Sequence, residues 1–168
     1  SLKTWEDYFE KAEIIGVDIE PAAAAYAGGR TSVIIGDLGE PGFLETLPEL
    51  KPRVIIDDAS HIWTHQLLAL FVLYHELMSG GIYIIEDIHT SLEPLAQFFS
   101  AGKKHSTFEV LLKVAEFMTG NYSQAPIIEG RQIEPLSRHA LFDEEIHLIA
   151  DETDAITFIE RSCILIKK

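Results

Sequence analysis

Two pairs of adjacent carboxylates each follow a run of aliphatic residues. Asp57 and Asp58 end the stretch VIIDD, and Glu86 and Asp87 end the stretch IYIIED. Carboxylates that converge in this way repel one another unless protons or a cation intervene. Oxygen ligands favour Mg²⁺, Mn²⁺ or Ca²⁺ over zinc. The pattern therefore predicts a divalent cation site with Asp58 and Asp87 as ligands, whereas Asp57 and Glu86 could bind cofactor groups, cap a helix or complete the metal shell.

A histidine lies close to this predicted cation site. His61 follows Asp58 by three residues, so it could act as a general base toward a hydroxyl whose pKa the metal has lowered. The alternative is that Ser60 and His61 simply cap the following helix. His65 forms an H-x-x-x-H pair with His61, but the glutamate of zinc proteases is missing, so we expect His65 to be structural.

Two further carboxylates end earlier aliphatic runs. Asp18 ends GVD, and Asp37 ends VIIGD. An acidic residue just past a strand of a nucleotide-binding fold accepts hydrogen bonds from ribose hydroxyls, which predicts Asp18 as a cofactor ligand. Asp37 could meet the base of the same nucleotide, with a helix cap or a solvated turn as its alternative.

Strands that alternate with helices must position these residues. Short aliphatic runs typical of strands occur at residues 14–20, 31–37, 53–58 and 82–87. Segments with helical spacing separate them, the longest at 62–78. This alternation predicts an α/β fold with a Rossmann-like, doubly wound, mostly parallel sheet, in which ligands bind beyond the carboxyl ends of the strands.

The second half of the chain is less regular. An amphipathic helix is expected at 105–120, capped by Ser106 or Thr107, and its apolar face is a candidate surface for a second subunit. Residues 121–143 are expected to form a long functional loop. Residues 144–152 and 155–168 are expected to form the two strands of a closing antiparallel hairpin.

Composition limits the classes of protein that the chain can belong to. The 168 residues are 47% hydrophobic, which fits a single domain over 1–168 with a sizeable core. The formal net charge of -14 disfavours nucleic acid and anionic lipid as partners. No apolar run is long enough to span a membrane. The only cysteine, Cys163, cannot form an internal disulfide, and we expect a cytoplasmic protein.

Five motifs together point to a known family. SLKTW, GVDIEP, GDLGEPGFL, VIIDDASH and GGIYIIEDIHTS occur in this order, and they resemble class I S-adenosylmethionine-dependent methyltransferases. The resemblance is greatest to the metal-dependent mycinamicin and macrocin sugar O-methyltransferases. It implies cofactor contacts, magnesium ligands and a general base. The implied cofactor residues are Ser1, Leu2, Asp18, Asp37, Leu38 and Asp57, the implied magnesium ligands are Asp58 and Asp87, and the implied base is His61.

The resemblance also implies what the chain does. We expect a methyl group to pass from S-adenosylmethionine to a hydroxyl of a sugar or glycosylated natural product, with Mg²⁺ or a similar cation bound. In the family a first strand, a glycine-rich turn and one more metal-ligating acid precede SLKTW, so we expect the sheet to lack its first strand and the cofactor pocket to be incomplete. Ser1 and Leu2 would be the remainder of that turn.

Two other functions remain open from the residues alone. An acidic residue after the second strand also suits a nicotinamide-dependent oxidoreductase, although hydride transfer does not call for a cluster of carboxylates. A non-catalytic α/β module that binds a partner or a metal is the other alternative.

Overall fold

The computed structural model divides the protein into two compact units. The described residues are 1–120, 127–128, 131–132 and 143–168. Unit 1 is Ser1–Pro48 and unit 2 is Glu49–Lys168. The expectation of one domain over residues 1–168 stays a prediction. None of the helices in the described residues has the length and apolar character needed to cross a bilayer.

Unit 1 is built around two short parallel strands. These are β1 (Ile14–Asp18) and β2 (Thr31–Ile35). Three short helical segments accompany them: α1 (Leu2–Tyr8), the 3-10 helix η1 (Pro21–Tyr26) and α2 (Pro41–Leu44). Pro21 begins η1, where its missing N–H has no helical partner to lose.

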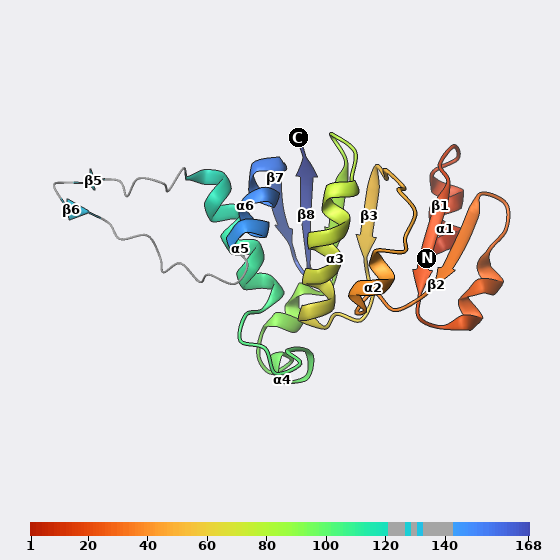
Figure 1. Ribbon diagram of the computed structural model, residues 1–168, viewed down its shortest axis with the longest axis horizontal. Helices are drawn as coiled ribbons and strands as arrows, with labels where there is room; N and C mark the ends of the chain where they lie inside the picture. Colours follow the sequence, from red (N-terminus) through yellow and green to blue (C-terminus); the bar gives the residue numbers. More distant parts are fainter. Residues whose placement is uncertain (121–126, 129–130, 133–142) are drawn as a thin grey trace. The chain divides into compact units, whose positions relative to one another are not determined.

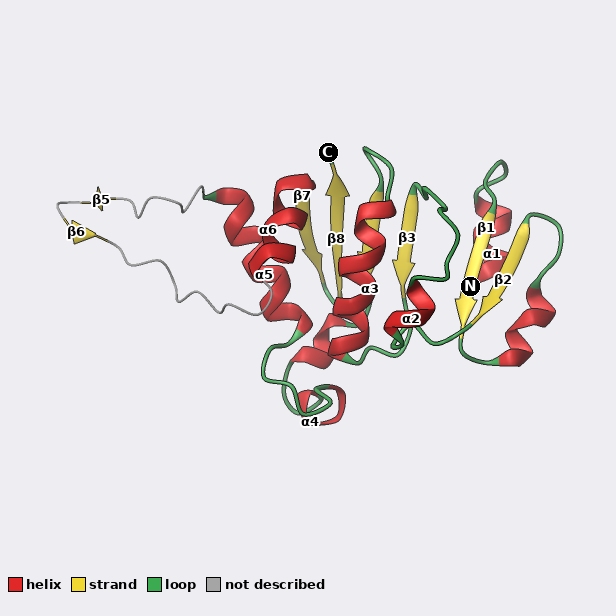
Figure 2. Cartoon of the chain, viewed as in Figure 1, coloured by secondary structure: helices red, strands yellow, loops and turns green. Residues whose placement is uncertain are grey.

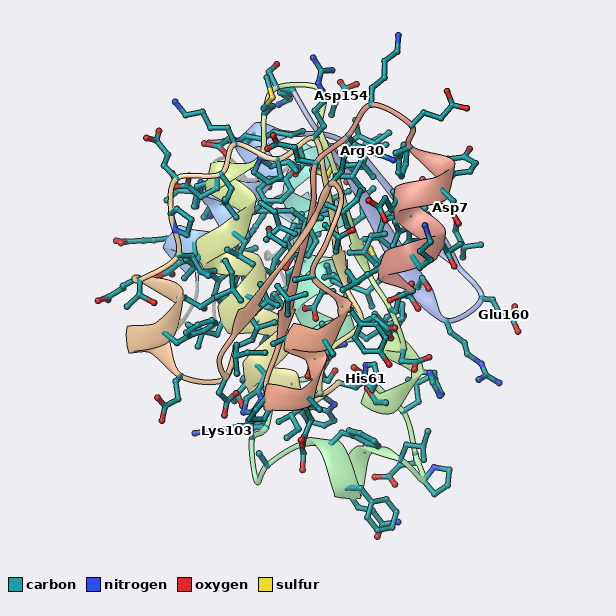
Figure 3. The ribbon with its side chains drawn as sticks, turned by 90° about the vertical axis from the view of Figure 1, so that its right-hand side faces the viewer. Asp7, Arg30, His61, Lys103, Asp154 and Glu160 are labelled. Carbon is teal, nitrogen blue, oxygen red and sulfur yellow. The ribbon has the colours of Figure 1, made fainter. Side chains whose placement is uncertain are left out.

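One arginine ties α1 to the strands of unit 1. The guanidinium of Arg30 donates to the carbonyls of Glu6, Phe9 and Ala12 (Figure 3). Carbonyl groups at the end of a helix have no partner within the helix. Arg30 therefore provides hydrogen-bond donors for the free carbonyl groups at the end of α1 and holds this helix beside the start of β2.

Unit 2 contains a four-stranded mixed sheet in the order β3-β4-β8-β7. Its strands are β3 (Val54–Asp57), β4 (Ile82–Ile85), β7 (Thr153–Ile159) and β8 (Ser162–Lys167). β3 and β4 are parallel, whereas β8 is antiparallel to both β4 and β7. β5 (Ile127–Ile128) and β6 (Arg131–Gln132) form a separate antiparallel pair. The predicted alternation of strands and helices is confirmed. The chain also closes with an antiparallel hairpin, but its strands β7 and β8 are not the two segments predicted for it.

The core of unit 2 lies between one face of this sheet and three helices (Figure 2). The helices are α3 (Trp63–Glu76), α5 (Thr107–Thr119) and α6 (Asp143–Glu152). The sheet contributes the buried residues Tyr83, Ile85, Cys163 and Leu165, which the strand pairing places on the same face. α5 begins at a capping box in which Ser106 and Glu109 bond each other's backbone N–H groups, so the predicted cap is confirmed.

The prediction for residues 144–152 was wrong, because they belong to α6 and not to a strand. Ile146, Ile149 and Ala150 are buried in the core, whereas Leu148 is exposed. This spacing of three and four is helical. The hairpin is therefore formed by β7 and β8, which turn at 160–161. Most of the loop predicted for 121–143 lies outside the described residues.

Candidate metal and catalytic site

The carboxyl ends of β3 and β4 meet at one edge of the sheet of unit 2. In their parallel pairing Asp57 lies opposite Ile85, so Asp58 and Asp87 follow the two strands at the same edge. In Figure 1 the arrow of β3 points toward this edge, on the side of the view where α4 (Ala96–Phe99) is drawn. Parallel pairing therefore brings the two predicted metal ligands together from separate parts of the sequence.

Asp58, His61 and Asp87 form a compact group at this edge. One ligand atom from each lies within 4.8 Å of the others. His61 Nε2 is 3.5 Å from Asp87 Oδ2 and 4.0 Å from Asp58 Oδ1. The other oxygen of Asp87, Oδ1, is 3.5 Å from His89 Nδ1. The carboxylate of Asp87 thus lies between two imidazole rings, and His61, which is labelled in Figure 3, has its Nε2 within 4.0 Å of both carboxylates.

The dimensions and chemistry of this group fit a hard divalent cation. Mg²⁺ binds oxygen at about 2.1 Å in an octahedron, so pairs of its ligands lie roughly 3 to 4 Å apart. The ligand atoms of Asp58 and Asp87 lie within 4.8 Å of each other, which is close to this spacing. Asp58 is exposed and Asp87 is partly buried. Two carboxylates would leave positions open for water or for substrate hydroxyls, as is usual for Mg²⁺.

The loop before α3 points His61 toward the carboxylates. The hydroxyl of Ser60 accepts from the N–H of Ile62 at 3.3 Å and is 2.9 Å from Nδ1 of His65. The residue that caps α3 is Ile62, which makes no side-chain cap bond. Neither Ser60 nor His61 occupies the cap position of α3, but the Ser60 hydroxyl does bond the N–H of the cap residue, so the alternative in which both cap the helix holds only for the contact of Ser60. The hydrogen bond between Ser60 and His65 suits a structural role for His65.

His61 and Asp87 both adopt left-handed backbone conformations. Their φ angles are 57° and 53°. Residues other than glycine rarely adopt this conformation, which costs on the order of 1–3 kcal/mol and persists only where the surroundings hold it. Strain of this kind is concentrated at functional sites.

Three buried polar side chains hold the turn that follows β4. Thr90, in the 3-10 helix η2 (Ile88–Ser91), donates from its hydroxyl to the carbonyl of Asp87 at 2.9 Å. Trp63 Nε1 donates to the carbonyl of Thr90 at 3.2 Å. Gln66 Nε2 donates to the carbonyl of Glu86 at 3.0 Å and its Oε1 accepts from Thr107. All three side chains belong to residues that are at most 6% exposed.

The remaining members of the two acidic pairs lie in different environments. Burial raises the pKa of Asp57 to about 6, and Asp57 Oδ2 makes no hydrogen bond to the described residues. Partial burial, and then the charges of Asp58 and Asp87, raise the pKa of Glu86. The charge of Asp57 contributes, after burial, to a raised pKa of the neighbouring Tyr83 hydroxyl. Asp57 therefore faces the core, and its role as a cofactor ligand stays a prediction.

The predicted cofactor residues of unit 1 lie in and beside its two strands. Asp18 ends β1 and accepts from the N–H of Glu20 at 2.9 Å. Asp37 follows β2 and accepts from the N–H of Gly39 at 2.7 Å, so the turn considered as its alternative does form. Each carboxylate has a second oxygen of the kind that ribose hydroxyls bind.

Ser1, Leu2 and Leu38 complete the predicted cofactor set. Ser1 precedes α1 and makes no side-chain cap bond. Leu2 packs so closely on Gly16 that a Cβ there would lie 2.7 Å from its Cδ1. Leu38 follows Asp37 and is partly buried. Their binding roles stay predictions.

An aromatic residue that the sequence pattern did not predict lies beside the site. The ring centroid of Phe99, in α4, lies 6.5 Å from that of His61. On the same segment Phe98 and Leu92 are exposed. The pair of adjacent phenylalanines after HTS was the available signal. Thr90 and Gln66 were missed too, because only the folded chain shows what they bond.

Sequence comparisons relate the chain to O-methyltransferases of Streptomyces and Micromonospora. It is 29% identical over 140 residues to the 8-demethyl-8-alpha-L-rhamnosyl tetracenomycin-C 2'-O-methyltransferase of Streptomyces olivaceus, covering 82% of this chain and 36% of that protein. It is 35% identical over 99 residues to the demethylmacrocin O-methyltransferase of Streptomyces fradiae, covering 56% and 24%. It is 31% identical over 96 residues to the mycinamicin VI 2''-O-methyltransferase of Micromonospora griseorubida, again covering 56% and 24%. No family model matches the chain.

Solved structures give the same relationship at the level of the fold. The MycE methyltransferase from the mycinamycin biosynthetic pathway, in complex with Mg, SAH and mycinamycin VI, matches 99% of this chain with a TM-score of 0.70 and 20% identity. The match covers 39% of that protein. The matches thus cover between 24% and 39% of the length of these proteins. The chain has the α/β fold of a class I methyltransferase, and its sequence resembles the sugar O-methyltransferases, as its motifs predicted.

Proposed function

We propose that this chain belongs to an S-adenosylmethionine-dependent O-methyltransferase that uses a divalent cation, with Mg²⁺ as the first choice. The observation that carries the proposal is the convergence of Asp58, His61 and Asp87 within 4.8 Å at the carboxyl ends of β3 and β4. The relatives named above, which methylate rhamnosyl tetracenomycin and macrolide compounds, support the same reaction. Hydride transfer does not call for this cluster. A non-catalytic module that binds a metal would also contain it, and the assay of methyl transfer below separates that alternative from the enzyme.

The residues of unit 2 have two roles, cation binding and proton transfer. The carboxylates of Asp58 and Asp87 would hold the cation, and the bound cation would orient an acceptor hydroxyl and lower its pKa. His61 then takes the proton through Nε2, the nitrogen that faces both carboxylates. The charge of Asp87 stabilises the imidazolium that forms, because the two groups are 3.5 Å apart.

His61 has a rival role that the same geometry supports. Its Nε2 lies within the group that could hold the metal, so His61 could ligate the cation instead of acting as a base. Titration of the chain with MnCl₂ separates the two roles. For a base, His61→Ala leaves the Mn²⁺ affinity within a fewfold of the wild-type value, whereas Asp58→Ala lowers it at least about tenfold. An equal loss in both variants would make His61 a ligand.

For the cofactor we propose Asp18 as the ribose ligand and Asp37 with Leu38 as the residues near adenine. Ser1, Leu2 and Asp57 are proposed to line the rest of its site. Support comes from the positions of Asp18, which ends β1, and Asp37, which follows β2. A carboxylate that follows a strand is the usual acceptor for ribose hydroxyls.

For the acceptor we propose a small molecule that carries a sugar on an apolar body. The ring of Phe99 provides an apolar surface near His61, and Phe98 and Leu92, close to it in the sequence, have exposed side chains. The names of the relatives support the same class of acceptor. We also propose a cytoplasmic location, with neither nucleic acid nor membrane as a partner, and self-association through the exposed part of α5 around Leu112.

The reaction is tested with labelled S-adenosylmethionine, MgCl₂ and glycosylated macrolides that carry free sugar hydroxyls. Methyl transfer should require the cation and should fall at least about a thousandfold in Asp58→Ala, Asp87→Ala and His61→Ala. Asp154→Asn, an exposed carboxylate in β7, is the matched control and should leave the rate unchanged. Calorimetry should also show S-adenosylhomocysteine binding. Binding of NADH in its place, or equal rates in all four variants, would reject the proposed function.

A further inference from the structure

Two residues of the proposed site hold left-handed backbone conformations in separate segments of unit 2. His61 lies in the loop between β3 and α3, and Asp87 lies in the turn after β4. Neither is a glycine, so each would relax toward ordinary φ values unless other groups held it. The relative positions of their side chains depend on both segments staying in place.

One buried hydroxyl lies between these two strained segments. Thr90 Oγ1 is 2.9 Å from the carbonyl oxygen of Asp87 and 3.3 Å from the carbonyl oxygen of His61. Thr90 is only 2% exposed, so water does not replace these contacts easily. The hydroxyl has a single proton, so the two carbonyls share it, with the shorter contact to Asp87.

Further bonds fix Thr90 itself. Its N–H donates to the carbonyl of Asp87 at 3.0 Å. Its carbonyl accepts from Nε1 of Trp63, the first residue of α3. Thr90 is therefore attached both to the turn after β4 and to the helix that follows His61.

We propose that Thr90 is a positioning residue that holds His61 and Asp87 in register through its hydroxyl. The inference rests on the proposed function for the roles of His61 as base and Asp87 as cation ligand. Thr90 itself touches neither substrate nor cation. Its hydroxyl maintains the 3.5 Å approach of His61 Nε2 to Asp87 Oδ2 by joining the two backbone segments that carry them.

Three variants separate positioning from simple stability. Thr90→Val removes the hydroxyl and keeps the branched shape, whereas Thr90→Ser keeps the hydroxyl and removes the methyl group. Thr153→Val is the matched control, because Thr153 is also 2% exposed and its hydroxyl also has two partners, Tyr74 and the carbonyl of Ile149. Both valine variants lose a buried hydroxyl that has two hydrogen-bond partners, so both should have a lower free energy of unfolding.

The first measurement needs no bound metal. Signals of the His61 imidazole in NMR spectra of the metal-free chain, assigned with His61→Ala, should shift in Thr90→Val by more than a linewidth. They should return toward the wild-type position in Thr90→Ser and stay there in Thr153→Val. Unshifted His61 signals in Thr90→Val would overturn the proposal, as would equal shifts in both valine variants.

The second measurement titrates the same proteins with MnCl₂. Thr90→Val should bind Mn²⁺ about tenfold more weakly, as is typical when a group that orients a metal ligand is lost. Thr90→Ser and Thr153→Val should stay within about twofold of wild type. If the wild-type chain fails to bind Mn²⁺, the proposed function fails, while the NMR result still decides whether Thr90 positions His61. Equal Mn²⁺ affinity in Thr90→Val and wild type would overturn the role of Thr90 in the cation site.

Discussion

In unit 2 the candidate site rests on a deep core, whereas in unit 1 the candidate residues rest on two strands with little buried beneath them. Among the described side chains of unit 1 the buried hydrophobic ones are Ala23 and Leu44. Unit 2 buries whole aromatic and aliphatic side chains, among them Leu70, Tyr74 and Leu165. A two-stranded sheet is marginally stable by itself, whereas several strands packed on helices are not.

This contrast teaches where geometry can be held under strain. The left-handed conformations of His61 and Asp87 are sustained by buried bonds from Thr90 and from its partner Trp63. In unit 1 the predicted ligands Asp18 and Asp37 close only local turns. A polar site with a fixed geometry needs a packed core to support it. Residues in surface turns can instead become ordered when a ligand binds.

The largest expected effect is on the protection of buried thiols. Burial raises the pKa of the Cys163 thiol to about 12, so at pH 8 a thiol reagent reacts only when β8 opens. In Cys163→Ala combined with Ala23→Cys, the new thiol of unit 1 should react about a thousandfold faster, because local opening there involves far less buried surface. Pulse labelling followed by mass spectrometry measures both rates. Equal rates would show that the two units open together.

Ionisation of the same thiol makes the free energy of unfolding depend on pH. Its pKa is higher in the folded chain than in the unfolded chain, where it is near 8.5. Stability from the neutral thiol is therefore complete below about pH 8.5 and is lost as the pH rises from there toward 12. Denaturant titrations from pH 8 to pH 11 should show a smaller loss of stability in Cys163→Ala than in wild type.

A matched pair of leucines comes next. Leu70→Ala in α3 should lower the free energy of unfolding of unit 2 by about 3 to 5 kcal/mol, because Leu70 is fully buried and leaves a cavity. Leu44→Ala in unit 1 should lower the stability of unit 2 by less than about 0.5 kcal/mol. Urea titration followed by near-UV circular dichroism, which reports the buried aromatics of unit 2, compares them. A large effect of Leu44→Ala would contradict the independence of the two cores.

Substitution of one carboxylate in each unit should affect the binding of a different ligand. Asp87→Asn should weaken Mn²⁺ binding about a hundredfold, equivalent to about 2.7 kcal/mol, and should leave S-adenosylhomocysteine binding within a fewfold. Asp18→Asn should do the opposite, weakening S-adenosylhomocysteine about tenfold and sparing Mn²⁺. Calorimetry with each ligand measures both constants. If Asp18→Asn weakened Mn²⁺ as strongly as Asp87→Asn, the assignment of separate roles would fail.

The smallest expected effect concerns the attachment of α1. Arg30→Met keeps an unbranched apolar side chain but removes the donors to Glu6, Phe9 and Ala12. It should lower the free energy of local opening of α1 by about 1 to 2 kcal/mol. Hydrogen exchange of the α1 amides measures this change. Lys11→Met, an exposed cation of the same unit, is the control and should have no effect.

Most of the architecture could be predicted because it depends on local patterns. Short aliphatic runs indicate strands, and the capping box of Ser106 and Glu109 marks the start of α5. The exception is α6, where the sequence supports two interpretations. Ile146, Leu148 and Ala150 alternate as in a strand, whereas Ile146, Ile149 and Ala150 have helical spacing. The segment is helical because this conformation packs Ile146, Ile149 and Ala150 into the core beside α5, and Leu148 is then exposed.

By itself the sequence determined which chemistry is available: carboxylates directly after aliphatic strands and a histidine three residues beyond one of them. Neighbours in sequence and strand propensity were enough for that. Only the tertiary structure decided that Asp58 and Asp87 share an edge, that His61 turns toward them and that Thr90 joins their segments. These arrangements depend on pairing and hydrogen bonds between residues 27 to 29 positions apart, and no local pattern encodes such contacts.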